Sequence, residues 1–200
     1  MMETILLFGI LWVVLAVLIV ILSDTRAALA LLGLNLAISV FLLTETDVFG
    51  AVATAIAGTV SAAIVLLAAS RTRMPQQEIS SRVLVLAALL TIVASYLVAF
   101  SLQGQLPAGH TFEGYFLVIL FGISLLTIIS QKSILKLLLG ILILENIATL
   151  ILAWAKNAAL FTVISEVFVV LITFTIAFIA IMDFAEYDTI DGTELTKLRG

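Results

Sequence analysis

The chain has 200 residues, of which 64% are hydrophobic and only 11% are charged, with a formal net charge of −4. Because soluble domains carry about 25% charged residues, this composition excludes an ordinary water-soluble domain and indicates a membrane protein. The chain has no cysteine, which excludes disulfides, thiolate metal sites and iron–sulfur ligation by its own residues, and its single histidine cannot build a haem or zinc site by itself.

Seven apolar runs are long enough to cross a bilayer, which takes about 20 helical residues. They cover residues 3–22, 26–44, 48–70, 81–102, 112–130, 133–155 and 158–182. Short polar segments separate these runs, so consecutive helices are expected to pack antiparallel. The sequence therefore predicts an all-α, polytopic membrane helix bundle of about seven transmembrane helices.

The orientation follows from the basic residues, because cytoplasmic loops carry an excess of lysine and arginine. With the N-terminus outside, only Lys156 falls on the outer side. The inner side then collects Arg26, Arg71, Arg73, Arg82, Lys132, Lys136, Lys197 and Arg199. We therefore expect an N-terminus outside and a C-terminus in the cytoplasm.

The third span, AVATAIAGTVSAAIVLLAAS, is crowded with small residues. Small side chains let neighbouring membrane helices approach closely. We favour an internal packing helix for this span, and a pore lined by Thr59 and Ser61 is the alternative.

Two glutamates, Glu145 and Glu166, lie deep inside apolar runs, whereas the other acidic residues lie at span ends, in loops or in the C-terminal tail. Glu145 is about 12 residues into the sixth span and Glu166 about 8 residues into the seventh, which places each carboxyl roughly 18 Å from the inner face. The two carboxyls are therefore expected at similar depth on adjacent helices.

An ionised carboxylate at mid-bilayer costs at least ~2.5–3.5 kcal/mol, so such residues face the bundle interior and are functional candidates. No basic residue of this chain is expected deep enough to neutralise either glutamate. Our hypothesis is that Glu145 and Glu166 are stations on a transmembrane proton or sodium path. The alternative is a neutral carboxyl with a structural role.

Four polar residues, Asn146, Thr149, Thr162 and Ser165, surround the two glutamates in the sequence. Thr149 lies one turn from Glu145, and Thr162 lies one turn from Glu166, so each can share a helix face with its carboxyl. They are candidates for holding ordered water, and plain interhelical hydrogen bonding is an equal alternative.

Lys132 and Lys136 lie on one helical turn at the inner mouth of the sixth span. They could form a cytoplasmic funnel for protons. We favour anchors that snorkel to the membrane surface.

Three segments are predicted. Residues 1–110 form a four-helix membrane scaffold, residues 111–182 a three-helix unit with the buried carboxyls, and residues 183–200 a cytoplasmic tail. The tail, DFAEYDTIDGTELTKLRG, is acidic and too short to be a domain. It is either solvated or docked on a neighbouring subunit.

Sequence motifs for chemistry are missing. The chain has no phosphate-binding glycine loop, no GxGxxG, no metal-ligand cluster and no Ser/His/Asp set. No catalytic residue or metal site is therefore predicted in this chain, and the energy for any ion movement is expected to come from a partner.

Three stretches resemble a known family: SQKSILKLLLGILILEN, the Ser-Glu pair of the last span, and the ending TIDGTELTKLRG. On these residues the second half is similar to component E of hydrogenase-4, which is itself similar in its last three helices to the K subunit of respiratory complex I. In the K subunit a glutamate follows the helix glycine and a second lies on the next helix. Here the glycine is Gly140, Glu145 lies about one turn further on than the first glutamate of the K subunit, and Glu166 falls where the second acid belongs.

The resemblance implies a non-catalytic membrane subunit of a group 4 hydrogenase or related complex in the inner (plasma) membrane. A cytoplasmic redox arm would drive proton or sodium translocation there. It implies antiporter-like membrane subunits as partners, contact with membrane lipids and no nucleic acid. This chain would hold no cofactor, whereas iron–sulfur clusters and a NiFe site would lie on partner subunits.

Two other functions remain open. The chain could be a subunit of a multisubunit cation/proton antiporter, whose C subunit is also K-like and which has no redox arm. It could also be a purely structural subunit that bridges larger pumps. A stand-alone transporter of small solutes is disfavoured because few polar groups line the other five spans.

Overall fold

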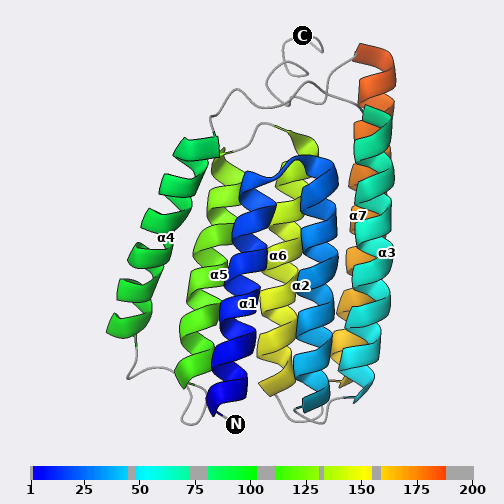
Figure 1. The fold of residues 1–200 in the computed structure, drawn as a ribbon. Coiled ribbons are helices and arrows are strands. Elements are labelled where there is room, and N and C mark those ends of the chain that lie inside the picture. The colour runs from blue at the N-terminus through cyan, green and yellow to red at the C-terminus, as the bar shows by residue number, and fades with distance from the viewer. Residues whose placement is uncertain are drawn as a thin grey trace.

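A computed structural model describes residues 2–44, 48–72, 81–102, 111–130, 133–154 and 159–187. These residues form seven α-helices, each long and apolar enough to cross a membrane (Figure 1). The helices are α1 Met2–Ile21, α2 Asp24–Thr44, α3 Val48–Thr72, α4 Ser81–Ser101, α5 Thr111–Ser130, α6 Ile134–Trp154 and α7 Ala159–Tyr187. The prediction of an all-helical, multi-pass membrane bundle is confirmed.

The last helix is longer than the sequence predicted. It continues beyond residue 182 to Tyr187, into the segment expected to be tail. Asp183 ends the apolar run, but neither glycine nor proline follows before Gly192, so nothing in the local sequence stops the helix. Asp183 is buried. The rest of the tail, residues 188–200, lies outside the described residues.

The helices form two layers, with α1, α2 and α3 in front and α5, α6 and α7 behind (Figure 1). Across the layers α1 packs on α5, α2 on α6 and α3 on α7. Contacts therefore cross the predicted boundary at residue 110 along the whole width of the bundle. The division into a four-helix scaffold and a three-helix unit at residue 110 stays a prediction.

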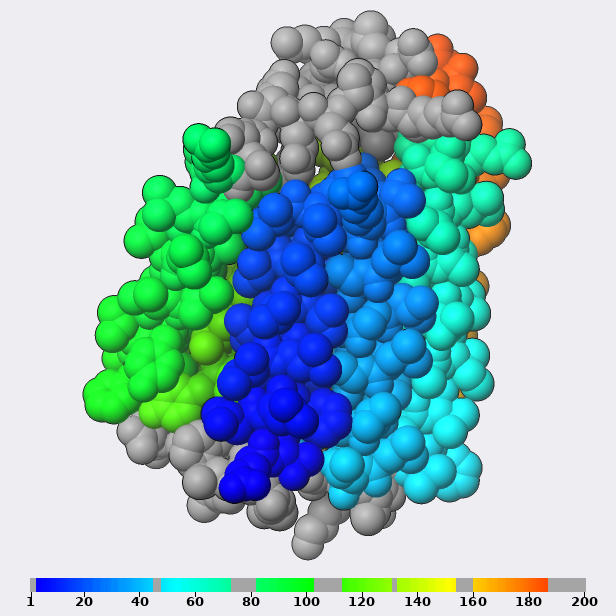
Figure 2. Space-filling view, viewed as in Figure 1, coloured from blue at the N-terminus to red at the C-terminus, as the bar shows by residue number. Residues whose placement is uncertain are grey.

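Helix α4 stands at the side of the bundle, where it packs mainly on α5. In the space-filling view α1, α2 and α3 pack edge to edge, while α4 flanks them (Figure 2). Its exposed side chains are large and apolar, for example Leu86, Leu90 and Val93. Such a surface fits lipid or another membrane subunit.

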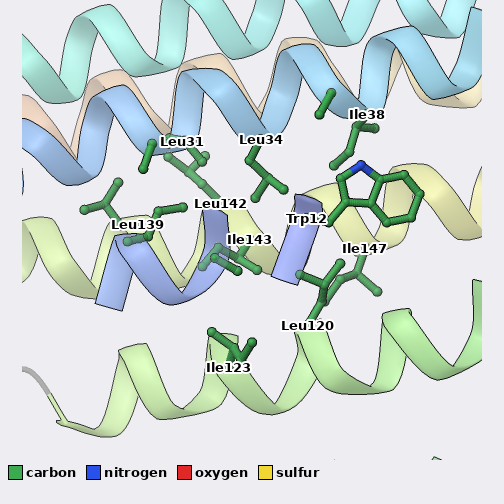
Figure 3. Close-up of a cluster of buried hydrophobic side chains, with 14 of the residues drawn as sticks. Trp12, Leu31, Leu34, Ile38, Leu120, Ile123, Leu139, Leu142, Ile143 and Ile147 are labelled. Atoms are coloured by element: carbon green, nitrogen blue, oxygen red, sulfur yellow. The ribbon is translucent and has the colours of Figure 1, made fainter. Parts of the chain in front are cut away.

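The core lies between the layers and includes Trp12 of α1 (Figure 3). The ring of Trp12 is 1% exposed and meets the Phe41 ring edge-on, with 5.0 Å between centroids. Dispersion packing of this kind holds helices together in a bilayer, where the surrounding lipid is as apolar as the core. The other labelled side chains of this core in Figure 3 are Leu31, Leu34, Ile38, Leu120, Ile123, Leu139, Leu142, Ile143 and Ile147.

The small residues of α3 serve close packing, as the favoured interpretation expected. A Cβ atom at Gly58 would overlap the side chain of Asn35, so the glycine permits α2 and α3 to approach. Thr59 is exposed and donates to the carbonyl of Ala55 in its own helix, whereas Ser61 is buried. Thr59 and Ser61 therefore face different environments and do not line a common pore.

Lys136, near the start of α6, is buried rather than snorkelling. Its ammonium donates hydrogen bonds to the carbonyls of Ile19, Val20 and Leu22, at the C-terminal end of α1. These carbonyls have no partner inside their own helix, and the helix dipole there attracts a cation. Asp24 attracts the same ammonium. For Lys136 the snorkelling interpretation was wrong, because partners for its charge lie inside the bundle.

We predict that Lys136→Met lowers the free energy of unfolding by about 2–4 kcal/mol, because it leaves buried carbonyls and Asp24 without their cation. Titration of the full chain with denaturing detergent measures this change. The control is Arg82→Met, which removes an exposed positive charge and should change stability by less than about 0.5 kcal/mol. Equal effects of the two substitutions would contradict the role of Lys136 as the cation that binds the carbonyls at the end of α1.

Candidate functional site

The two deep glutamates lie together between α6 and α7, at one level of the bundle. The hydroxyl of Thr149 connects them, with its Oγ1 at 2.9 Å from Oε1 of Glu145 and 3.4 Å from Oε1 of Glu166. Thr149 is one turn from Glu145 on α6, so the two side chains share a helix face. The packing of α7 on α6 brings Glu166 to the same hydroxyl. The sequence led us to expect similar depth on adjacent helices, and the contact through Thr149 is an addition from the structure.

The carboxyls of Glu145 and Glu166 are close neighbours, because an oxygen of each lies within hydrogen-bonding distance of the same Thr149 hydroxyl. Two ionised carboxylates this close in an apolar interior would repel each other, which favours a proton on one of them. The pair is thus arranged to hold one proton between two carboxyl groups. Glu166 is enclosed, with 3% of its surface exposed, whereas Glu145 is partly exposed.

The first layer contributes a second hydroxyl to the pair. Thr54 of α3 donates from Oγ1 to Oε1 of Glu166 at 2.7 Å. Thr54 and Glu166 are 112 residues apart in the chain, and one threonine among several hydroxyls in a small-residue span carries no sequence signal. Thr54 is therefore a site residue that the sequence did not predict.

A small polar pocket surrounds the pair, at the meeting point of α2, α3, α6 and α7. Its lining is Asn35, Gly58, Ser61, Leu142, Glu145, Asn146, Glu166 and Val169. The pocket is narrow and has no room for a water molecule. Asn35 was not predicted as a lining residue, whereas Ser61 was named only as part of an alternative pore with Thr59.

Two buried polar atoms of this lining have no hydrogen-bond partner among the described residues, Oγ of Ser61 and Oδ1 of Asn146. The amide nitrogen of Asn146 donates to the carbonyl of Leu142 at 2.8 Å, which fixes the orientation of the amide. Its oxygen is therefore an acceptor in need of a donor. Buried polar atoms are normally satisfied, so these two point to a ligand that carries hydrogen or positive charge.

The other predicted supporting residues are dispersed. Thr162 is buried one turn from Glu166, whereas Ser165 is only partly buried and does not line the pocket. Lys136 lies near the start of α6, on the carbonyls at the end of α1, and not with the carboxyls. Lys132 lies outside the described residues.

The pocket has the chemistry of a site for a proton or a small monovalent cation. Its described lining offers carboxyl, amide and hydroxyl oxygens and no lysine or arginine. Within the described ranges, no group of three or more His, Cys, Asp or Glu residues is placed to hold a metal ion.

No protein-family model matches this chain, and neither curated proteins nor solved structures give a match. The functional reasoning therefore starts from the carboxyl pair and its surroundings.

We predict that Thr149→Val changes the infrared band of the protonated carboxyl, because the substitution removes a hydroxyl donor to both glutamates while preserving side-chain volume. The carbonyl stretch should move to higher frequency, as it does when an acceptor loses a hydrogen bond. Thr175→Val is the control, since Thr175 is exposed and bonds only the Leu171 carbonyl of its own helix. A carboxyl band identical to that of the unmodified chain would contradict the assigned contacts.

Proposed function

We propose that this chain is a membrane subunit of a hydrogenase-4-like, complex I-related complex that couples a redox reaction to proton or sodium translocation. Glu145 and Glu166 would form part of its transmembrane ion path. The chain would lie in the inner (plasma) membrane with its N-terminus outside and its C-terminus in the cytoplasm. The redox cofactors would belong to partner subunits.

The observation that carries this proposal is the carboxyl pair in the middle of an apolar bundle. Titratable groups at such a depth are expensive to keep, and they are found where ions or protons cross membranes. A purely structural contact between α6 and α7 needs no charge and could be made by uncharged side chains. The cost of two glutamates is understandable if their protonation changes during a transport cycle.

The two carboxyls would have different roles. Glu145, which is partly exposed, would exchange its proton with groups outside the pair. Glu166, which is enclosed and bonded by Thr54, would accept the proton from Glu145 as the O–H bond of one carboxyl breaks and that of the other forms. Thr149 would keep the two oxygens aligned, because proton transfer requires hydrogen-bond contact.

Glu145→Gln and Glu166→Gln, each introduced into the assembled complex, should lower ion pumping in inverted membrane vesicles by at least about tenfold, because glutamine cannot take up and release the proton. Assembly of the complex, followed by copurification in mild detergent, should be unchanged since glutamine keeps the shape of the side chain.

The matched control is Glu186→Gln, which removes an exposed carboxyl near the end of α7 and should leave pumping at its original rate. Normal pumping by both deep-site variants would overturn the proposal and favour a structural bridging subunit. The subunits that copurify decide the source of energy. Iron–sulfur or hydrogenase subunits would support a redox arm, and antiporter subunits alone would assign the chain to a cation/proton antiporter.

A further inference from the structure

Helices α3 and α7 run in the same direction and pack along their length. Thr54 and Glu166 face each other across this contact, as their 2.7 Å hydrogen bond shows. Seven residues further along each helix are Ser61 and Thr173. Seven residues are nearly two helical turns, or about 10.5 Å, and return to almost the same face. Ser61 and Thr173 therefore occupy the next level of the seam between α3 and α7.

Both hydroxyls at this level are buried and have no hydrogen-bond partner among the described residues. Ser61 is 1% exposed and Thr173 is 0% exposed. A hydroxyl enclosed in an apolar bundle without a partner is unfavourable, because it has lost its hydrogen bonds to water and gained none.

Other helical hydroxyls of the same chain avoid this cost. Serine and threonine can bond the carbonyl four residues earlier in their own helix. Ser39, Thr72 and Thr127 are buried and all do so, as do the less buried Thr59, Thr91, Ser101 and Thr175. The orientation of Ser61 and Thr173 therefore departs from the usual arrangement in this bundle.

The unsatisfied hydroxyls are continuous with the carboxyl site. Ser61 lines the same pocket as Glu145 and Glu166. Asn146, whose Oδ1 is unsatisfied, also lines this pocket. Beyond Ser61 and Thr173, the next positions in the same register are Ala68 and Ala180, which are both fully buried. Small side chains thus continue the seam toward the end of α7, where Asp183 is buried.

We propose that Ser61 and Thr173 form a buried water-binding step, which extends the carboxyl site along the seam between α3 and α7 toward Asp183. Water is the ligand that fits, because it both donates and accepts hydrogen bonds as two hydroxyls and an amide oxygen require. The pocket is too narrow for water in this packing, so the proposal includes a small separation of α3 and α7 that admits it.

This step deepens the proposed function, on which its role in transport rests, whereas water binding itself can be tested separately. A bound water connects the hydroxyls to the carboxyl pair, and a proton crosses as each O–H bond breaks while the next one forms. No charge other than the transferred proton moves. The two hydroxyls lie between the carboxyl pair and the end of α7 that carries the buried Asp183.

The absence of cysteine from the chain makes a direct test feasible. Ser61→Cys and Thr173→Cys each introduce a single thiol whose S–H stretch lies in an otherwise empty region of the infrared spectrum. The full-length variants in lipid nanodiscs are transferred to D2O, and conversion of S–H to S–D is followed with time. Thr127→Cys is the control, because Thr127 is equally buried but bonds its own helix.

The thiols at 61 and 173 should exchange at least about tenfold faster than the thiol at 127, since exchange requires contact with water. Adding Thr173→Val to Ser61→Cys should slow exchange at 61, because the water loses one of its two hydroxyl partners. This second variant keeps the test decisive if Thr173→Cys fails to fold. Exchange at 61 no faster than at 127, or unaffected by Thr173→Val, would overturn the proposal.

The outcomes separate this inference from the proposed function. Fast exchange at 61 and 173 together with normal pumping in the glutamine variants would keep the water-binding step and reject the ion path. Slow exchange together with lost pumping would keep the carboxyl site and reject the seam as its connection.

Discussion

A carboxyl group inside a membrane bundle must find its hydrogen-bond partners there, since lipid supplies none. Glu166 meets this requirement through Thr54 of α3 and Thr149 of α6, and Thr149 also serves Glu145. One set of hydrogen bonds thus ties both layers at a single level. Gly58 lets α2 and α3 approach closely at this level, and the approach brings Asn35 into the pocket lining.

Polar groups in this bundle divide into two kinds. Lys136 and Thr127 are buried but fully engaged, the first with α1 carbonyls and the second with its own helix, so their role is structural. Trp12 Nε1 and Ser130 Oγ lack partners among the described residues, but neither residue lines the pocket. Ser61, Asn146 and Thr173 likewise keep atoms without partners, and all three lie on the helices around the carboxyl pair. Stability alone does not account for the second kind, which is why we connect these atoms to water and proton movement.

The seven helices were predictable because the bilayer fixes the length of an apolar run, and so was the similar depth of Glu145 and Glu166 on adjacent helices, although their contact was not. Thr54 was not, because its pairing depends on how α3 packs against α7. Lys136 was misread for a similar reason: a lysine near a span end usually snorkels, and only the packing of α6 on α1 brings it to free carbonyls. Contacts between side chains of helices that are distant in the sequence leave no periodic pattern from which they could be predicted.

The most direct test of the central claim is a carbon-13 NMR titration of the Glu145 carboxyl in the full-length chain, with and without Glu166→Gln. Two carboxyls that share a proton titrate as one coupled system, so removing one must change the other. We predict that the titration midpoint of Glu145 moves by more than about one pH unit when Glu166 is replaced. An unchanged midpoint would mean that the two carboxyls are independent and would contradict the paired site.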